Sequence, residues 1–75
     1  MKFAIIECIN GNYFIRSEGI TVLENAIVQY HDRCKVLWSA QDVVTGMVKI
    51  VDEYLECVEG YREYIHHEQQ EEPQE

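Results

Sequence analysis

The fold is decided by residues 4–16, which read Ala-Ile-Ile-Glu-Cys-Ile-Asn-Gly-Asn-Tyr-Phe-Ile-Arg. Two runs rich in β-forming side chains flank Asn10-Gly11, and this dipeptide favours a type I′ turn, in which both central residues need a positive φ. We therefore predict a β-hairpin with a two-residue loop. Its register places these residues opposite each other: Ile9 and Asn12, Cys8 and Tyr13, Ile6 and Ile15, Ala4 and Ser17.

This register divides the hairpin side chains between two faces, because opposed residues share a face. One face is apolar, and we expect it to pack in the core: Ala4, Ile6, Cys8, Tyr13 and Ile15. The other face is mixed and holds Phe3, Ile5, Glu7, Phe14, Arg16 and Glu18. A turn at Gly11-Asn12 is the alternative, and it would exchange the faces of the second strand.

A long helix is predicted over residues 22–40. Thr21 and Glu24 have the spacing of a capping box, in which each side chain bonds a free backbone N–H at the start of a helix. The residues that follow show a helical period. Their apolar stripe consists of Leu23, Ala26, Ile27, Tyr30, Cys34, Leu37 and Trp38.

Two more strands are predicted after the helix. Residues 43–51 are rich in β-branched side chains, and residues 61–67 place Tyr61, Glu63 and Ile65 on one side and Arg62, Tyr64 and His66 on the other. A helix through this region is the alternative, but it would stack its acidic residues and contain Gly46 and Gly60. We therefore expect an α+β fold of order ββαββ, an antiparallel sheet with one long helix on one face, with ββαα as the alternative.

Length and charge indicate one acidic domain. The 75 residues allow a single domain, which we place at residues 1–67, and residues 68–75 contain no apolar side chain and are predicted to be a disordered acidic tail. The net charge is −8, and all of it comes from residues 50–75. Because no basic face is visible, we expect no direct binding of nucleic acid.

Cysteine usage and hydropathy indicate a compartment. The three cysteines are an odd number without a CxxC pair, which is typical of free thiols in a reducing environment. No signal peptide is visible, and no apolar run is long enough to span a membrane. We therefore predict a cytoplasmic protein that does not bind membranes.

The residues that could carry chemistry form weak patterns. His31 and Cys34 are three positions apart on the predicted helix and are candidate metal ligands, but structural zinc sites usually have two close ligand pairs. Spacing favours a core position for Cys34. Motifs for phosphate binding or nucleophilic catalysis are not visible. We therefore expect neither an enzyme nor a cofactor.

Two surfaces are candidates for binding a partner. Phe3, Ile5 and Phe14 lie together on the mixed hairpin face, and a contiguous exposed apolar patch usually marks an interface. An acidic surface is expected from Asp52, Glu53, Glu56, Glu59 and Glu63. We predict a non-enzymatic protein-interaction module that forms a homodimer through the hairpin sheet. The alternatives are a small metal-binding or redox protein using His31 and Cys34, and an acidic decoy that binds a basic nucleic-acid-binding protein.

Overall fold

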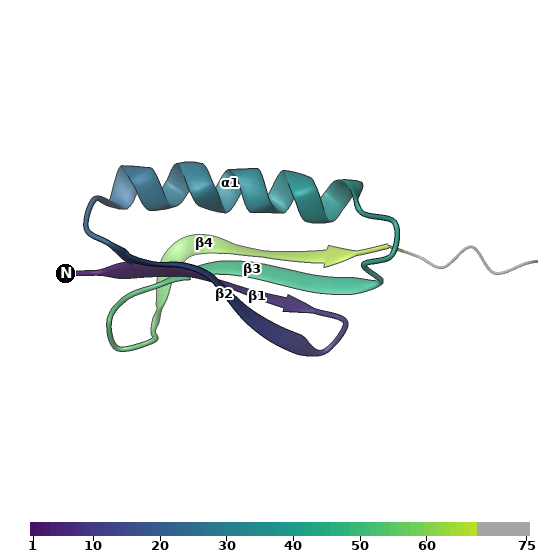
Figure 1. Ribbon diagram of the computed structural model, residues 1–75, viewed down its shortest axis with the longest axis horizontal. Coiled ribbons are helices and arrows are strands. Elements are labelled where there is room, and N and C mark those ends of the chain that lie inside the picture. The colour runs from purple at the N-terminus through teal and green to yellow at the C-terminus, as the bar shows by residue number, and fades with distance from the viewer. Residues whose placement is uncertain (68–75) are drawn as a thin grey trace, which may run out of the picture.

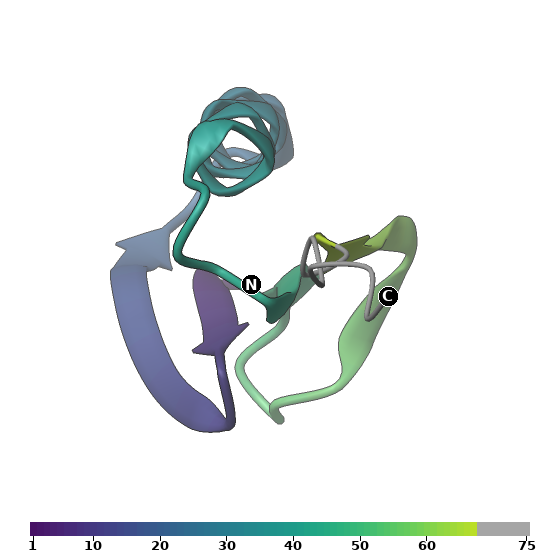
Figure 2. The same ribbon diagram turned by 90° about the vertical axis from the view of Figure 1, so that its right-hand side faces the viewer.

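A computed structural model describes residues 1–67 as a sheet with one helix on it. The elements are β1 (Phe3–Ile9), β2 (Asn12–Ile20), α1 (Leu23–Ser39), β3 (Thr45–Val51) and β4 (Cys57–His66). The four strands pair antiparallel in the order β2-β1-β3-β4, and α1 lies across one face (Figures 1 and 2). The predicted α+β fold of order ββαββ is confirmed. The predicted tail, residues 68–75, lies outside the described residues.

The hairpin turns at Asn10-Gly11, as predicted. Both residues have positive φ, 50° and 91°, as a type I′ turn requires. Cys8 pairs with Tyr13 and Ile6 with Ile15, so the predicted register is correct near the turn. It shifts farther on, where Ser17 pairs with Ile5 and not with Ala4. A β-bulge inserts the extra residue.

The assignment of the two hairpin faces was wrong. The helix packs on the face that carries Phe3, Ile5 and Glu7, and all three side chains are buried. Tyr13 and Ile15 lie on the opposite face and are exposed. The prediction placed the mixed face away from the core, but Glu7 and Arg16 on that face form an ion pair, which offsets part of the cost of burying the carboxylate.

The helix agrees with its predicted range but not with its predicted cap. It spans Leu23–Ser39, the N-cap is Val22, and no side chain caps it. The capping box predicted for Thr21 and Glu24 is therefore wrong. The core-facing residues of the stripe are Ala26, Tyr30, Cys34 and Leu37, which pack against Ile5, Val48, Ile50 and Ile65 of the sheet.

A close approach joins the end of α1 to β3. A Cβ atom added at Gly46 would lie 3.1 Å from Val43 Cγ1 and 3.2 Å from Leu37 Cδ2. Glycine is therefore the residue that lets Leu37 lie directly on the strand. Among residues 1–67 no helix is long and apolar enough to cross a membrane.

Candidate functional site

The face of the sheet opposite α1, here called the open face, carries two rows of side chains that cross all four strands. The first, the tyrosine row, is Tyr13, Cys8, Met47 and Tyr64, on β2, β1, β3 and β4 in turn. The second, the cation row, is Ile15, Ile6, Lys49 and Arg62 in the same strand order. Six of these eight side chains present apolar or aromatic surface, and none is acidic.

A shallow pocket of about 340 Å³ lies where the two rows meet. Tyr13 and Tyr64 stand on the two edge strands, while Cys8 and Met47 lie between them on the central strands. The remaining lining residues are Thr45, Gly46, Lys49 and Arg62. The pocket is therefore bounded by two aromatic rings and by two cations.

The two cations of the pocket are adjacent and have no carboxylate partner among residues 1–67. Lys49 and Arg62 are directly paired across β3 and β4. The ion pairs of the described chain both involve Glu7, on the other face. The Arg62 guanidinium instead lies over the ring of Tyr64, 5.5 Å from its centre. The open face thus carries local positive charge in a protein whose net charge is −8.

The free edge of β2 is the second unusual surface. β2 is the first strand in the sheet order, so among residues 1–67 no strand pairs with one side of its backbone. Tyr13, Phe14 and Ile15 are consecutive on this strand and are 72%, 41% and 63% exposed. Three consecutive exposed apolar residues on an edge strand are a template for pairing with another strand.

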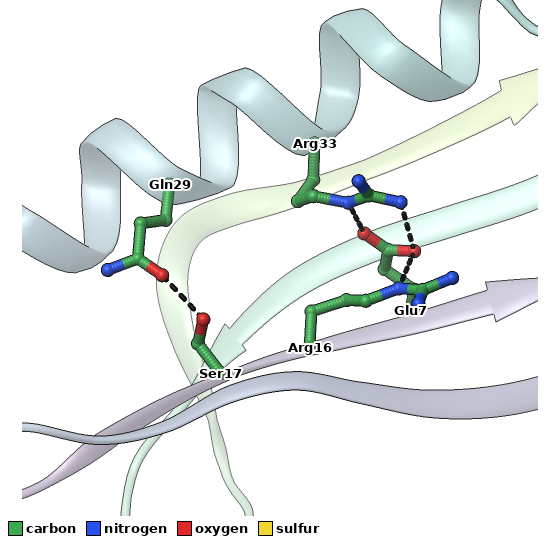
Figure 3. A network of polar contacts seen from close by, with 5 residues as sticks. All are labelled: Glu7, Arg16, Ser17, Gln29 and Arg33. Carbon is green, nitrogen blue, oxygen red and sulfur yellow. Dashed lines mark hydrogen bonds and ion pairs between the residues drawn. The ribbon is translucent and has the colours of Figure 1, made fainter.

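A buried carboxylate fixes the hairpin under the helix (Figure 3). Glu7 is 0% exposed and accepts hydrogen bonds from Arg33 Nε on α1, from Arg33 Nη2 at 3.2 Å and from Arg16 Nε on β2 at 2.8 Å. Burial acts to raise the pKa of Glu7, but the hydrogen bonds and charges of the two arginines outweigh it and lower that pKa below its ordinary value of 4.5. Glu7 therefore stays ionised inside the protein.

The structure separates the three predicted interface residues. Phe3 and Ile5 are buried beneath α1, so the predicted apolar patch of Phe3, Ile5 and Phe14 is wrong as an exposed surface. Phe14 remains partly exposed at the β2 edge, where Arg16 lies 4.9 Å from its ring centre. Tyr13 and Ile15, which were predicted to lie in the core because the uncharged hairpin face was taken as the buried one, are exposed.

His31 and Cys34, the candidate metal ligands, differ in environment. His31 is exposed, and Cys34 is buried against the sheet. Burial raises the pKa of the Cys34 thiol, and it raises the pKa of the neighbouring Tyr30 to about 12. Within residues 1–67 no group of three or more potential ligands could hold a metal ion.

The predicted acidic residues are distributed over different parts of the molecule. Asp52 Oδ1 accepts hydrogen bonds from the backbone N–H groups of Tyr54 and Glu56 and so builds the turn between β3 and β4. Glu63 lies on the helix side of β4 and accepts a hydrogen bond of 2.7 Å from Trp38 Nε1. Glu53 accepts one from the backbone N–H of Lys2, and Glu59 lines a hollow beside Arg62.

Comparisons with protein-family models, with curated proteins and with solved structures find no significant match.

Proposed function

We propose that the protein is a non-enzymatic protein-interaction module that forms a homodimer through the free edge of β2. The observation that carries the proposal is the exposure of Tyr13, Phe14 and Ile15 in succession on an edge strand. Soluble proteins usually protect such edges with charges, bulges or a covering segment. A second copy of the strand would cover both the backbone edge and the apolar side chains.

The backbone of β2 supports pairing over a short segment. The turn places the N–H of Asn12 toward Ile9 of β1, so that the N–H and C=O groups of Tyr13 and Ile15 point away from β1. Beyond them, the bulge near Arg16 and the positive φ of Gly19, 73°, interrupt the regular edge. The segment available to a second strand is therefore residues 12–16.

This segment is complementary to itself under a two-fold axis at Phe14. An antiparallel copy would place Phe14 opposite the partner's Phe14 and Tyr13 opposite the partner's Ile15. Asn12 would lie opposite the partner's Arg16, so that no like charges meet. The β4 edge is less apolar, because its strand contains the charged residues Glu59, Arg62 and Glu63.

The expected dimer is weak to moderate in affinity. Covering the exposed surface contributes roughly 1–2 kcal/mol for each of three side chains in each protomer. Association opposes this with about 4–15 kcal/mol of lost freedom. The most favourable combination of these figures gives about −8 kcal/mol, so we expect a dissociation constant no lower than roughly 1 μM.

Sedimentation equilibrium tests the proposal with two matched variants. The wild type should approach twice its 8.9 kDa mass as the protein concentration rises. Ile15→Lys should remain a monomer, because it places a cation in the pairing segment. Val28→Lys, on a similarly exposed residue (59%) of α1, should dimerise like the wild type. A wild type that stays at 8.9 kDa up to about 500 μM would refute the dimer, because the proposal requires association below that concentration.

The compartment that fits this proposal is the cytoplasm. Cys8, Cys34 and Cys57 are all free thiols, which are typical of proteins in a reducing environment. When the protein is purified from its native host without reductant, we expect all three thiols to react in a thiol titration. A disulfide in that preparation would contradict the assignment.

A further inference from the structure

The pocket on the open face is a second candidate binding site, which lies beside the β2 edge and shares Tyr13 with it. Its floor and walls combine the apolar surfaces of Cys8 and Met47 with the rings of Tyr13 and Tyr64. At about 340 Å³ it is near the lower limit of ligand pockets, which is enough for one large side chain and a neighbouring polar group. The methionine adds a side chain that adapts to irregular apolar shapes.

The positive charge of the pocket favours an anionic ligand. Lys49 and Arg62 are cross-strand neighbours at the wall, and none of the eight lining residues is acidic. Neither cation has an ion-pair partner within residues 1–67. An anionic group placed between them would gain two charge-assisted contacts, and the apolar floor would take an adjoining hydrophobic side chain.

A second copy of the open face does not fit this pocket. Neither row of a second open face contains a carboxylate that could lie between Lys49 and Arg62. Pairing at the edge of β2 does not need one. Self-association therefore uses the edge of β2 and the pocket uses the open face, and Tyr13 is the residue that the two surfaces share.

A polyanion fits less well than a single carboxylate. A nucleic-acid strand carries a charge about every 3.4 Å, and it needs a continuous basic track. Here the basic surface consists of two residues, and Glu59 lies beside Arg62 in the adjoining hollow. One carboxylate with an apolar neighbour makes use of the cations without bringing further negative charges near Glu59.

We propose that this pocket binds a short acidic–apolar segment of a partner protein, in which an Asp or Glu carboxylate lies between Lys49 and Arg62 and an adjacent aromatic or aliphatic side chain packs on Met47 between Tyr13 and Tyr64. The binding mode requires no dimer. It adds a heterologous partner to a module whose own copies meet at β2.

The probe is a random dodecapeptide library displayed on phage and selected on the immobilised full chain. Enriched peptides should contain an acidic residue next to an aromatic or aliphatic one, and the affinity of a synthetic peptide should fall as salt rises. Arg62→Glu and Lys49→Glu should each weaken it at least about tenfold. Lys35→Glu, on an exposed cation of α1, should leave the affinity unchanged, and thermal unfolding checks that every variant folds.

Three outcomes would overturn the inference. The first is a selection that does not enrich acidic residues. The second is a peptide that binds Arg62→Glu as tightly as it binds the wild type. The third is binding of a twelve-nucleotide oligothymidylate that depends on Arg62. Ile15→Lys separates this test from the dimer proposal, because a monomeric variant should still bind the peptide. An Ile15→Lys variant that is monomeric and still binds the peptide agrees with both proposals. A wild type that is monomeric and binds the peptide refutes the dimer alone.

Discussion

Arg33 of α1 donates hydrogen bonds to both carboxylate oxygens of Glu7 on β1. Arg16 of β2 donates a third, so one buried carboxylate connects the helix to both strands of the hairpin. This contact lies on the face of the hairpin that α1 covers, together with the buried side chains of Phe3 and Ile5. The uncharged face, with Tyr13 and Ile15, is left open to a partner.

Replacing Glu7 by Gln should destabilise the fold. The amide keeps the shape of the side chain but removes the charge that two arginines share, and breaking a buried ion pair leaves its partners without compensation. We expect a loss of about 2–4 kcal/mol in the free energy of unfolding by urea. Glu24→Gln, an exposed residue in the first turn of α1, is the control and should change this free energy by about 0.5 kcal/mol or less. Equal effects of the two substitutions would show that the buried ion pair is unimportant.

The stability that Glu7 contributes should depend on pH in one direction. Because the pKa of Glu7 is lowered below 4.5 in the folded protein, ionised Glu7 stabilises the fold above that value. This contribution is lost as pH falls through the folded-state pKa. The difference in unfolding free energy between wild type and Glu7→Gln should therefore be constant between about pH 7 and pH 5 and should shrink below about pH 4.5. A difference that grows on acidification would contradict the sign of the shift.

Asn10 should stabilise the fold through its side-chain hydrogen bonds as well as through its conformation in the turn. Its Oδ1 accepts hydrogen bonds from the backbone N–H groups of Val44 (2.9 Å) and Thr45 (3.1 Å), and its Nδ2 donates one to Asp42 O at 3.0 Å. Asn10→Gly keeps the positive φ but removes these contacts, so we expect a loss of about 1–3 kcal/mol in the free energy of unfolding. A neutral or stabilising effect would indicate that turn geometry alone selects this residue.

Gly46 should not tolerate even a methyl group. An alanine there would press against Val43 and Leu37 at 3.1 and 3.2 Å. We expect Gly46→Ala to lower the unfolding free energy by about 1–3 kcal/mol. Thr45→Ala, at the exposed neighbouring position, should cost less. Chemical denaturation of both variants measures the two losses in unfolding free energy. Equal losses would show that the cost comes from strand propensity and not from the close approach.

The local signals of the sequence predicted the elements and their order. Asn10-Gly11 gave the turn and the register beside it, and the helical stripe gave the range of α1. The β-branched residues from Val43 onward identified β3 correctly, against a competing helical period. These features depend on neighbours in the chain, so a single sequence contains the information.

The orientation of the hairpin depends on a contact across 26 residues and was missed. Glu7 looks like a surface residue until Arg33 is placed over it. The sequence does contain an indication that Arg33 faces the sheet, because Arg33 lies between Tyr30 and Leu37 at the spacing of the buried stripe. The predicted capping pair of Thr21 and Glu24 is a similar case, because the helix begins one residue later than the motif implies.

The wrong assignment of the hairpin faces also led to the wrong interface residues. Phe3 and Ile5 were predicted to be exposed together with Phe14, and the structure leaves Phe14 at the surface. The pairing of Lys49 with Arg62 joins two segments that are separated by the irregular residues between β3 and β4. A register through such a turn cannot be read from residue types, so the cationic pocket was not predictable.

Amide hydrogen exchange of Tyr13 and Ile15 at two protein concentrations tests the central claim, the pairing of β2 with a second copy, most directly. Both N–H groups point away from β1, whereas the N–H of Asn12 points toward it and serves as the reference. Protection of Tyr13 and Ile15 should rise between about 10 μM and about 500 μM and should be absent in Ile15→Lys. Fast exchange of Tyr13 and Ile15 at both concentrations, with Asn12 protected throughout, would contradict the account.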